Sequence, residues 1–296
     1  MQTLAEIREY VSQVIEDNSE DTLMVIDMWI NKALKSLCDK YIWSGYSRTR
    51  TITPDSNGSF YVPAAFSGVI RIYPANDSFG SFTYLSISSL RGNRIAEPYY
   101  IEGEPLTEDE KINTDATITN NSKNISTATA FFNLTDDLLK PVIINNNGYE
   151  YEISQVIDDS NAVLSLPYRG ESIAGTSSII VNPAGRRRFI VYDSDGTPYT
   201  NDIVLVYKIN PQPLYNDTDR PLINADEALK FGALIESLRN EKYSVDAERI
   251  KNDYFDAVAN ARQSEVKAPK KRLPEGLITP LPPFSFKSNR SFRGGR

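Results

Sequence analysis

A long apolar stripe with helical spacing marks the N-terminal part of the chain. Its members recur at i, +3, +4, +7, +8, +11 and +15, in the order Ile26, Trp29, Ile30, Ala33, Leu34, Leu37 and Tyr41. This period predicts one amphipathic helix that begins after a cap at Asn18 or Ser19. The helix is expected to end at about Ser44, before Gly45. A shorter stripe predicts a preceding helix over residues 3–16, and each helix must bury its apolar face against another element.

Two further amphipathic segments lie near the other end of the sequence. After Pro221, Asn224 is placed to cap a helix with Glu227 three residues later, a variant of the capping box. Following a break near residues 240–244, helical spacing resumes and continues to about Ser264. The two pairs of helices are expected to pack on one another, which brings distant parts of the sequence into one helical bundle.

The residues between the two pairs follow a different pattern, with short apolar runs separated by Gly, Pro, Asn and Asp. The predicted strands cover residues 60–62, 69–73, 82–85 and 99–103. Two later runs, 188–192 and 203–208, flank the turn at residues 193–196 and predict a β-hairpin with an extended loop.

Residues 107–183 are rich in Asn, Ser, Thr and Ile, and they are interpreted as an inserted domain. Five short strands at this density predict a small β-barrel. These strands cover residues 127–132, 142–144, 149–157, 162–166 and 178–181. The predicted fold class is therefore α+β. A core of helical bundle and β-sheet takes residues 1–106 and 184–266, the barrel takes 107–183, and an extended C-terminal tail takes 267–296.

The tail differs from the rest of the chain in charge and composition. It holds five prolines, eight cations and the single acid Glu275, so its net charge is +7 while residues 1–266 carry −14. Cations and apolar anchors in an extended, proline-stiffened segment are typical of docking into a groove of an acidic or aromatic-lined partner. A disordered tail with incidental charge is the alternative. The residues expected to bind the partner are Lys270, Lys271, Arg272, Leu281, Phe284, Phe286 and Phe292.

The composition excludes several kinds of chemistry. The chain has no histidine and one cysteine, Cys38, which removes internal disulfides, His-based triads and His-containing zinc sites. The net charge of −7 and the pI of about 4.9 argue against general nucleic-acid binding. Neither a signal peptide nor a membrane span is expected from the sequence. The common motifs of nucleotide loops, nucleophile elbows and zinc proteases are not found, so we expect no enzyme and no cofactor.

Acidic clusters are open to two interpretations. Asp136-Asp137, Asp158-Asp159 and residues 193–196 offer oxygen ligands for calcium, but Asp and Asn are also the preferred residues of turns. The third cluster resembles the start of an EF-hand loop, yet Val204 stands where the loop needs its bidentate glutamate. We favour turns for all three.

Two further clusters have the same ambiguity. The triplet Arg186-Arg187-Arg188 offers phosphate contacts, but a salt-bridged surface or a subunit interface is the more common role of such a triplet. Tyr99, Tyr100 and Glu102 have the composition of a sugar-binding rim, although aromatic clusters at strand ends usually belong to a core.

Four segments, taken in order, resemble the adaptor (head-to-tail connector) proteins of tailed bacteriophages, particularly short-tailed ones. They are residues 26–34 with 41–43, 60–63 followed by 69–72, 202–208 with Pro211, and 217–223 running into 227–234. The phrase Ala228-Leu229-x-x-Gly232-Ala233 resembles the opening of the C-terminal helix pair in such adaptors. Residues 148–153 and 162–170 are similar to small β-barrel modules of phage structural proteins. Together these segments cover about half of the chain.

The resemblance implies a ring of about 12 copies bound beneath the portal protein, which extends the DNA channel toward the tail. It implies a C-terminal segment that reaches into the portal, DNA that passes without specific binding, and no catalysis. The location implied is the neck of the virion, after synthesis in the host bacterial cytoplasm. The large insert departs from the family pattern and is expected outside the ring, where it receives tail-nozzle or fibre proteins. The alternatives are a tail-nozzle or fibre-attachment protein of the virion and a glycan-binding module.

Overall fold

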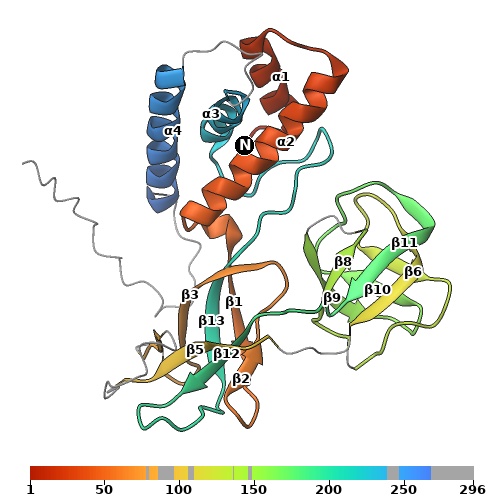
Figure 1. Cartoon of the computed structure of the whole chain (residues 1–296), viewed down its shortest axis with the longest axis vertical. Helices are drawn as coiled ribbons and strands as arrows, with labels where there is room; N and C mark the ends of the chain where they lie inside the picture. Colours follow the sequence, from red (N-terminus) through yellow and green to blue (C-terminus); the bar gives the residue numbers. More distant parts are fainter. Residues whose placement is uncertain are drawn as a thin grey trace, which may run out of the picture.

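The computed structural model describes residues 1–77, 80–85, 97–105, 110–135, 137–145, 149–238 and 247–267. Figure 1 shows three parts: a helical body at the top, two small sheets below it, and a closed barrel at one side. The predicted α+β class is confirmed, together with the packing of N-terminal on C-terminal helices and the inserted barrel. The part of the predicted tail beyond residue 267 lies outside the described residues.

The helical body brings together segments that are far apart in the sequence. It consists of α1 (Leu4–Ile15), α2 (Glu20–Lys40), α3 (Asp226–Ser237) and α4 (Ala247–Lys267). Helix α1 begins with a capping box, in which Thr3 and Glu6 each accept a hydrogen bond from the other's backbone amide. Helix α3 packs against α1, α2 and α4. The core of the bundle includes Ile7, Ile26, Ile30, Leu34, Leu229, Ala233 and Leu234, all at most 1% exposed.

A glycine allows α3 to approach α2 closely. A Cβ atom at Gly232 would lie 2.8 Å from the Cβ of Ala33 on α2, which is closer than such atoms pack, and 3.5 Å from Cε2 of Tyr254 on α4. The glycine therefore lies at the point where α3 is held between its two neighbours. Its φ angle is ordinary, so the requirement is for space and not for an unusual backbone conformation.

The predicted end of α2 needs correction. Helix α2 ends at Lys40, four residues before the predicted end, because Tyr41 is extended and the indole of Trp43 donates to the Leu37 carbonyl at 3.1 Å. Gly45 belongs to a short 3-10 turn, η1 (Ser44–Tyr46), where a Cβ would lie within 2.0 Å of the Leu222 carbonyl oxygen.

Helix α3 also begins differently from the prediction. Ala225 and not Asn224 occupies its N-cap position, and Ala225 has no side-chain oxygen to accept from the first-turn amides. Two acidic residues in the first turn, Asp226 and Glu227, face the positive end of the helix dipole instead.

Two small sheets connect the helical body to the rest of the chain. The first is antiparallel in the order β1 (Ser47–Ile52), β13 (Ile203–Ile209), β3 (Phe66–Pro74). The second has the order β2 (Ser59–Tyr61), β12 (Arg188–Tyr192), β5 (Tyr99–Gly103), β4 (Thr83–Tyr84). Aromatic rings join the sheets, since Phe189 contacts Phe66 at 5.9 Å between centroids and Phe66 stacks on Tyr207 at 6.0 Å.

The predicted hairpin of residues 188–192 with 203–208 is wrong. Both segments are strands, but β12 pairs with β2 and β5 while β13 pairs with β1 and β3, so they lie in different sheets. Each strand already has a partner on both edges, which leaves no edge for the other. The turn after β12 closes on itself through a bridge between Tyr192 and Pro198.

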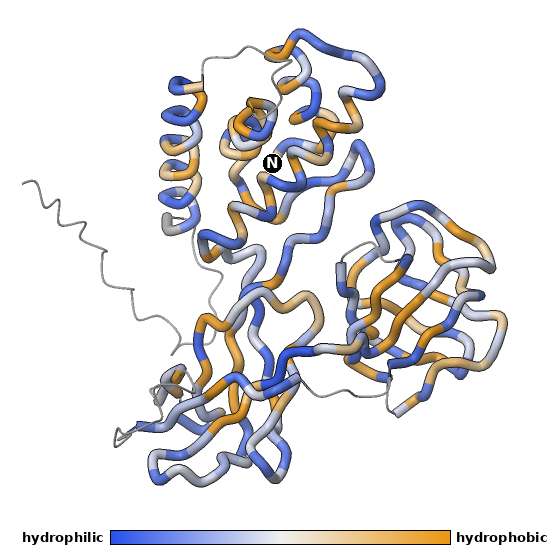
Figure 2. The backbone as a smooth tube through the Cα atoms, viewed as in Figure 1, coloured by the Kyte–Doolittle hydropathy of each residue, from blue (hydrophilic) through white to orange (hydrophobic). Residues whose placement is uncertain are grey.

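The insert forms a closed barrel of six antiparallel strands. They are β6 (Lys111–Ile118), β7 (Asn124–Thr127), β8 (Pro141–Ile144), β9 (Glu150–Val156), β10 (Asn161–Leu164) and β11 (Ile173–Val181). The prediction missed β6 and placed a strand at residues 127–132, mostly beyond the end of β7. Figure 2 shows hydrophobic residues concentrated along the barrel strands and hydrophilic residues along the loops. The barrel interior is filled by Ile118, Ile125, Val142, Ile144, Ile153, Leu164 and Ile179, each at most 1% exposed.

Polar contacts attach the barrel to the body. The Arg50 guanidinium lies 2.7 Å from a Glu152 carboxylate oxygen, and the Ala65 amide donates to Glu150 at 3.0 Å. On the side nearer the helices, Arg169 lies 3.4 Å from the buried Asp219. The barrel therefore stands beside the sheets and below the helices, as Figure 1 shows, and its interior is continuous with the apolar cluster of the body.

Candidate partner-binding surfaces

The residues predicted to dock the tail all lie beyond the described part of the chain. This applies to Lys270, Lys271, Arg272, Leu281, Phe284, Phe286 and Phe292. The structure does fix the point from which the tail leaves. Glu265, in the last turn of α4, accepts hydrogen bonds from the Ser44 hydroxyl at 2.9 Å and the Ser44 amide at 3.2 Å. The end of α4 is thus held beside η1, where the helical body meets the sheets.

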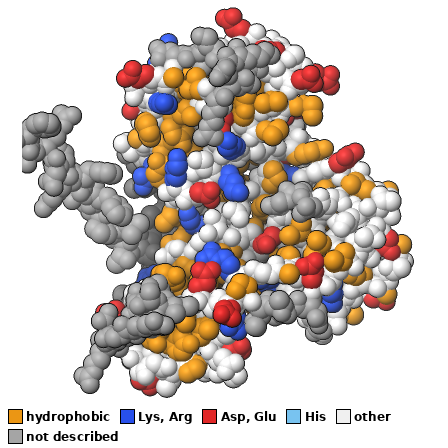
Figure 3. All heavy atoms as spheres, in the orientation of Figure 1, with side chains coloured by type: hydrophobic (Ala, Val, Ile, Leu, Met, Phe, Trp, Pro, Cys, Tyr) orange, Lys and Arg blue, Asp and Glu red, His pale blue; other side chains and the backbone are white. Residues whose placement is uncertain are grey.

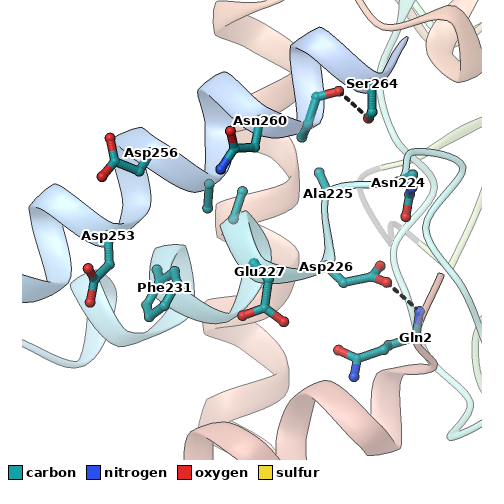
Figure 4. A pocket seen from close by; sticks show the side chains of 13 residues that line it. Gln2, Asn224, Ala225, Asp226, Glu227, Phe231, Asp253, Asp256, Asn260 and Ser264 are labelled. Atoms are coloured by element: carbon teal, nitrogen blue, oxygen red, sulfur yellow. Dashed lines mark hydrogen bonds between the residues drawn. The ribbon is translucent and has the colours of Figure 1, made fainter. Parts of the chain in front are cut away.

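An acidic groove of about 640 Å³ lies between α4, the start of α3 and the first residues of the chain. Figure 4 shows Asp253 and Asp256 on the α4 side and Glu227 and Asp226 on the α3 side. Asp226 accepts from the Gln2 amide at 2.9 Å, and the Glu227 carboxylate pairs with Lys230 at 2.7 Å. Asp253 lies 3.7 Å from the Arg249 guanidinium, so three of the four carboxylates are already engaged within the chain.

The outer faces of two helices carry exposed apolar side chains. On α2, Met24, Val25 and Met28 are 67%, 37% and 69% exposed, and on α4 Phe255 is 62% exposed. Figure 3 shows apolar side chains gathered over the helical body on the face in view. Sequence reasoning missed these residues because it followed only the buried stripe. A signal was present, since Met24 and Met28 are apolar residues placed off that stripe.

A second apolar surface is a loop of the barrel, which we call the leucine loop and define as residues 133–140. Within its described part, Leu134, Leu138 and Leu139 are 61%, 45% and 44% exposed. The loop is held by Asp137, whose side chain is fully buried and accepts from the Lys111 ammonium at 2.9 Å on both oxygens. Leu139 has a φ of 64°, a conformation that costs a leucine energy and persists only where the surroundings fix it.

Two arginines of the triplet are engaged within the fold. Arg186 donates to the Asn182 side chain at 2.8 Å and to the Val62 carbonyl at 2.7 Å. Arg187 forms a two-pronged pair with Glu102 at 2.6 and 3.1 Å, and this pair raises the pKa of Arg187. The salt-bridged interpretation of the triplet agrees with these contacts.

The acidic clusters form turns. Asp158 accepts from the Ser160 amide at 2.9 Å, and Asp195 accepts from the Thr197 hydroxyl at 2.6 Å and the Thr197 amide at 2.9 Å. These bonds lower the pKa of both carboxyls. Asp137 is paired with lysine, and Asp136 lies outside the described residues. Over the part of the chain that the structure describes, no group of three His, Cys, Asp or Glu side chains is arranged to hold a metal ion.

The aromatic cluster considered as a sugar-binding rim belongs to a core. Tyr99 and Tyr100 are each 8% exposed, with Tyr99 stacked on Tyr192 and Tyr100 edge-on to Phe189. Burial raises the pKa of both phenols. Glu102 is engaged by Arg187, so this cluster presents no free carboxylate beside an exposed ring.

No protein-family model matches the chain, and no curated protein matches it. Among the helices that the structure describes, none is long and apolar enough to cross a membrane.

Proposed function

We propose that this protein is a head-to-tail adaptor of a tailed bacteriophage, a structural protein that forms a ring beneath the portal and continues the DNA channel toward the tail. The observation that carries the proposal is the layout of the chain. A helical bundle made from distant segments holds the base of a +7 segment at a fixed point, and a separate barrel stands at its side. These are three parts suited to three partners: like copies, the portal and the tail.

The charge distribution supports the same proposal. Residues 1–266 carry −14, so a channel lined by this body repels the DNA backbone and lets DNA move without sticking. The basic residues are concentrated in the tail, where Lys270, Lys271 and Arg272 precede the aromatic anchors. A segment of this kind suits an acidic or aromatic-lined groove on the portal.

Electron microscopy of the purified protein mixed with the portal ring of the same particle tests the proposal. The full-length chain is compared with a chain that ends at Lys267, because this truncation keeps all of α4 and the bond from Glu265 to Ser44. We expect a ring stacked on the portal with the full-length chain and no stacking with the truncated one. Equal stacking by both chains would rule out the docking role of the tail.

A matched variant separates charge from anchoring. Replacing Phe284, Phe286 and Phe292 by serine keeps the +7 charge and the chain length, so it tests the aromatic anchors alone. We expect portal affinity to fall at least tenfold, since buried aromatic anchors dominate binding energy at interfaces. Unchanged affinity would leave the cations as the only docking groups.

A second candidate is a fibre-attachment or tail-nozzle protein at the distal tail, and the leucine loop favours it. Three exposed leucines on a fixed loop form an apolar surface on the barrel, which stands apart from α4. In the adaptor proposal the same loop receives tail components. Locating the protein within the particle with a labelled antibody fragment decides between them, because the adaptor lies against the portal and the alternative does not. No association of the full-length chain with the portal would favour the distal position.

A further inference from the structure

The exposed apolar residues of α2 and α4 differ in shape. Met24 and Met28 are one turn apart, so they form two neighbouring ridges on the same side of α2, with Val25 beside them. Methionine is flexible and adapts to the surface that it meets. The outer face of α2 therefore offers an adaptable gap between two apolar ridges.

Phe255 has the opposite shape. Its ring packs edge-on against the buried Tyr254 at 5.7 Å between centroids, which restricts its position. Of the exposed side chains one turn from it on α4, Asn252 and Ala259 are smaller and Lys251 is charged, so none adds a second large apolar group. Phe255 consequently projects from α4 as a single knob, the complement of a gap between two ridges.

The two faces lie on opposite flanks of the helical body. Helix α3 separates α2 from α4, with Gly232 between Ala33 and Tyr254. In Figure 1, α4 forms the left edge of the body, while α1 and the first half of α2 lie at the right. One copy therefore cannot bring its own knob and gap together, but two copies side by side can. Such a contact is head-to-tail, and it generates a closed ring where the rotation between copies closes.

The charges beside the two faces are complementary. Glu20 and Asp21 are exposed in the first turn of α2, one turn before Met24. On α4, Lys251 lies one turn before Phe255 and is exposed, whereas Arg262, two turns after Phe255, lies over the Tyr41 ring of its own chain at 4.9 Å. If the two helices run in the same direction, Lys251 meets these acids, which places opposite charges next to the apolar contact.

We propose that Phe255 of one copy inserts between Met24 and Met28 of the next copy, and that this contact repeats around the ring. The partner is a second copy of this chain, because both halves of the contact are present on it, on opposite flanks and with matching charge. The inference rests on the proposed function, since a ring requires each copy to use two different faces.

Disulfide trapping in the full-length protein tests the contact. The double variant Met28→Cys/Phe255→Cys places one thiol on each face, and mild oxidation at pH 8 joins thiols that meet between copies. The native Cys38 does not interfere, because it is 3% exposed and burial raises its pKa to about 12. We expect a ladder of covalent oligomers on a denaturing gel, as each copy joins two neighbours.

The controls separate this contact from others. Each single variant should give no ladder, and so should Leu134→Cys/Phe255→Cys, whose first thiol is similarly exposed but lies on the barrel. Dimers from Met28→Cys alone at the rate of the double variant would indicate pairing of α2 with α2 and would overturn the inference. A failure of the double variant to form a ladder at its highest soluble concentration would also overturn it.

A second variant measures the interface without cysteine. Phe255→Asp places a charge on an exposed position, so the monomer should fold as before, and we expect self-association to weaken at least tenfold by sedimentation velocity. Ile157→Asp, at a 54% exposed barrel position, is the control and should not change it. Rings of Phe255→Asp on the portal would overturn this contact while leaving the adaptor proposal in place. A disulfide ladder without portal binding would support this contact and contradict the adaptor proposal.

Discussion

The helical body and the barrel achieve their stability in different ways. The body needs segments nearly 200 residues apart, since α3 and α4 bury Leu229 and Leu234 against helices from the start of the chain. The barrel is continuous from Lys111 to Val181 and closes on itself. Apolar packing holds the body together, and the barrel is joined to it by a few polar contacts and by buried aromatic residues such as Tyr149, which belong to the same apolar cluster. A change in the barrel should therefore remain local, and a change in the bundle should affect distant segments.

The largest effect is expected from Asp137→Ala in the barrel. The change removes a fully buried carboxylate, leaves the Lys111 ammonium without its partner and deprives the Asn133 amide of an acceptor at 2.8 Å. Broken buried pairs cost about 3–5 kcal/mol, and the partial exposure of Lys111 places this one near the lower figure, about 3 kcal/mol. Hydrogen exchange followed by mass spectrometry should show lost protection in residues 111–181 and unchanged protection in α2 and α3.

Asp158→Ala is the matched control, because that carboxylate belongs to an exposed turn. Its effect on exchange should be small. Equal loss of protection in the barrel and in α2 after Asp137→Ala would show that the two parts unfold together, which would contradict the comparison.

The next effect is expected from Gly232→Leu in the bundle. The new side chain would overlap Ala33 on α2 and press on Tyr254 on α4, so all three helices must shift. Overpacking of this kind costs about 1–3 kcal/mol. Chemical denaturation should show the loss, and exchange should rise in α2 and α4 together. Gly68→Ala is the control, since its Cβ would meet only Lys208 at 3.7 Å and should leave stability within about 0.5 kcal/mol of the native value.

The bundle was the more predictable part, and its periodicity explains why. Helices with a 3.6-residue period show their buried face directly in the sequence, as residues 26–41 do. The packing of the N-terminal helices on the C-terminal helices followed from this pattern. Their ends were less predictable. Trp43 and Leu222 determine where α2 stops and why Gly45 is needed, and both are tertiary contacts. A local pattern does not contain them.

Strand pairing was harder to predict than strand position. Residues 188–192 and 203–208 are strands, yet their partners lie far away in the sequence, where aromatic contacts such as Phe189 with Phe66 and Tyr100 also form. Strand β6 was missed because its buried positions include the polar Asn113 and the small Ala116, which give a weak apolar alternation. Of the candidate surfaces, the sequence indicated the tail, while the outer face of α2 and the leucine loop required knowledge of what is covered.

A smaller effect is expected where the barrel meets the body. A double-mutant cycle on Arg50 and Glu152, whose side chains are each 24% exposed, should give a coupling energy of about 0.5–1 kcal/mol. The same cycle on Arg8 and Asp27 within the bundle should give more, about 1–2 kcal/mol, because both oxygens of Asp27 are engaged at 2.6 and 2.7 Å. The comparison would be weakened if the barrel pair proved the stronger of the two.

The smallest effect concerns the leucine loop and has the opposite sign. Leu139→Gly removes the cost of a left-handed conformation, about 1–2 kcal/mol, but gives back about 0.5–1 kcal/mol through the greater freedom of the unfolded chain. The net expectation is a barrel stabilised by about 0.5 kcal/mol, measured by thermal unfolding. Leu138→Gly, next to it with an ordinary φ, should instead destabilise the barrel by a similar amount. Opposite signs at neighbouring leucines would show that Leu139 is retained at a cost to stability, as expected for a side chain that a partner contacts. Destabilisation by both would mean that Leu139 supports the barrel itself and that the loop needs no partner to explain it.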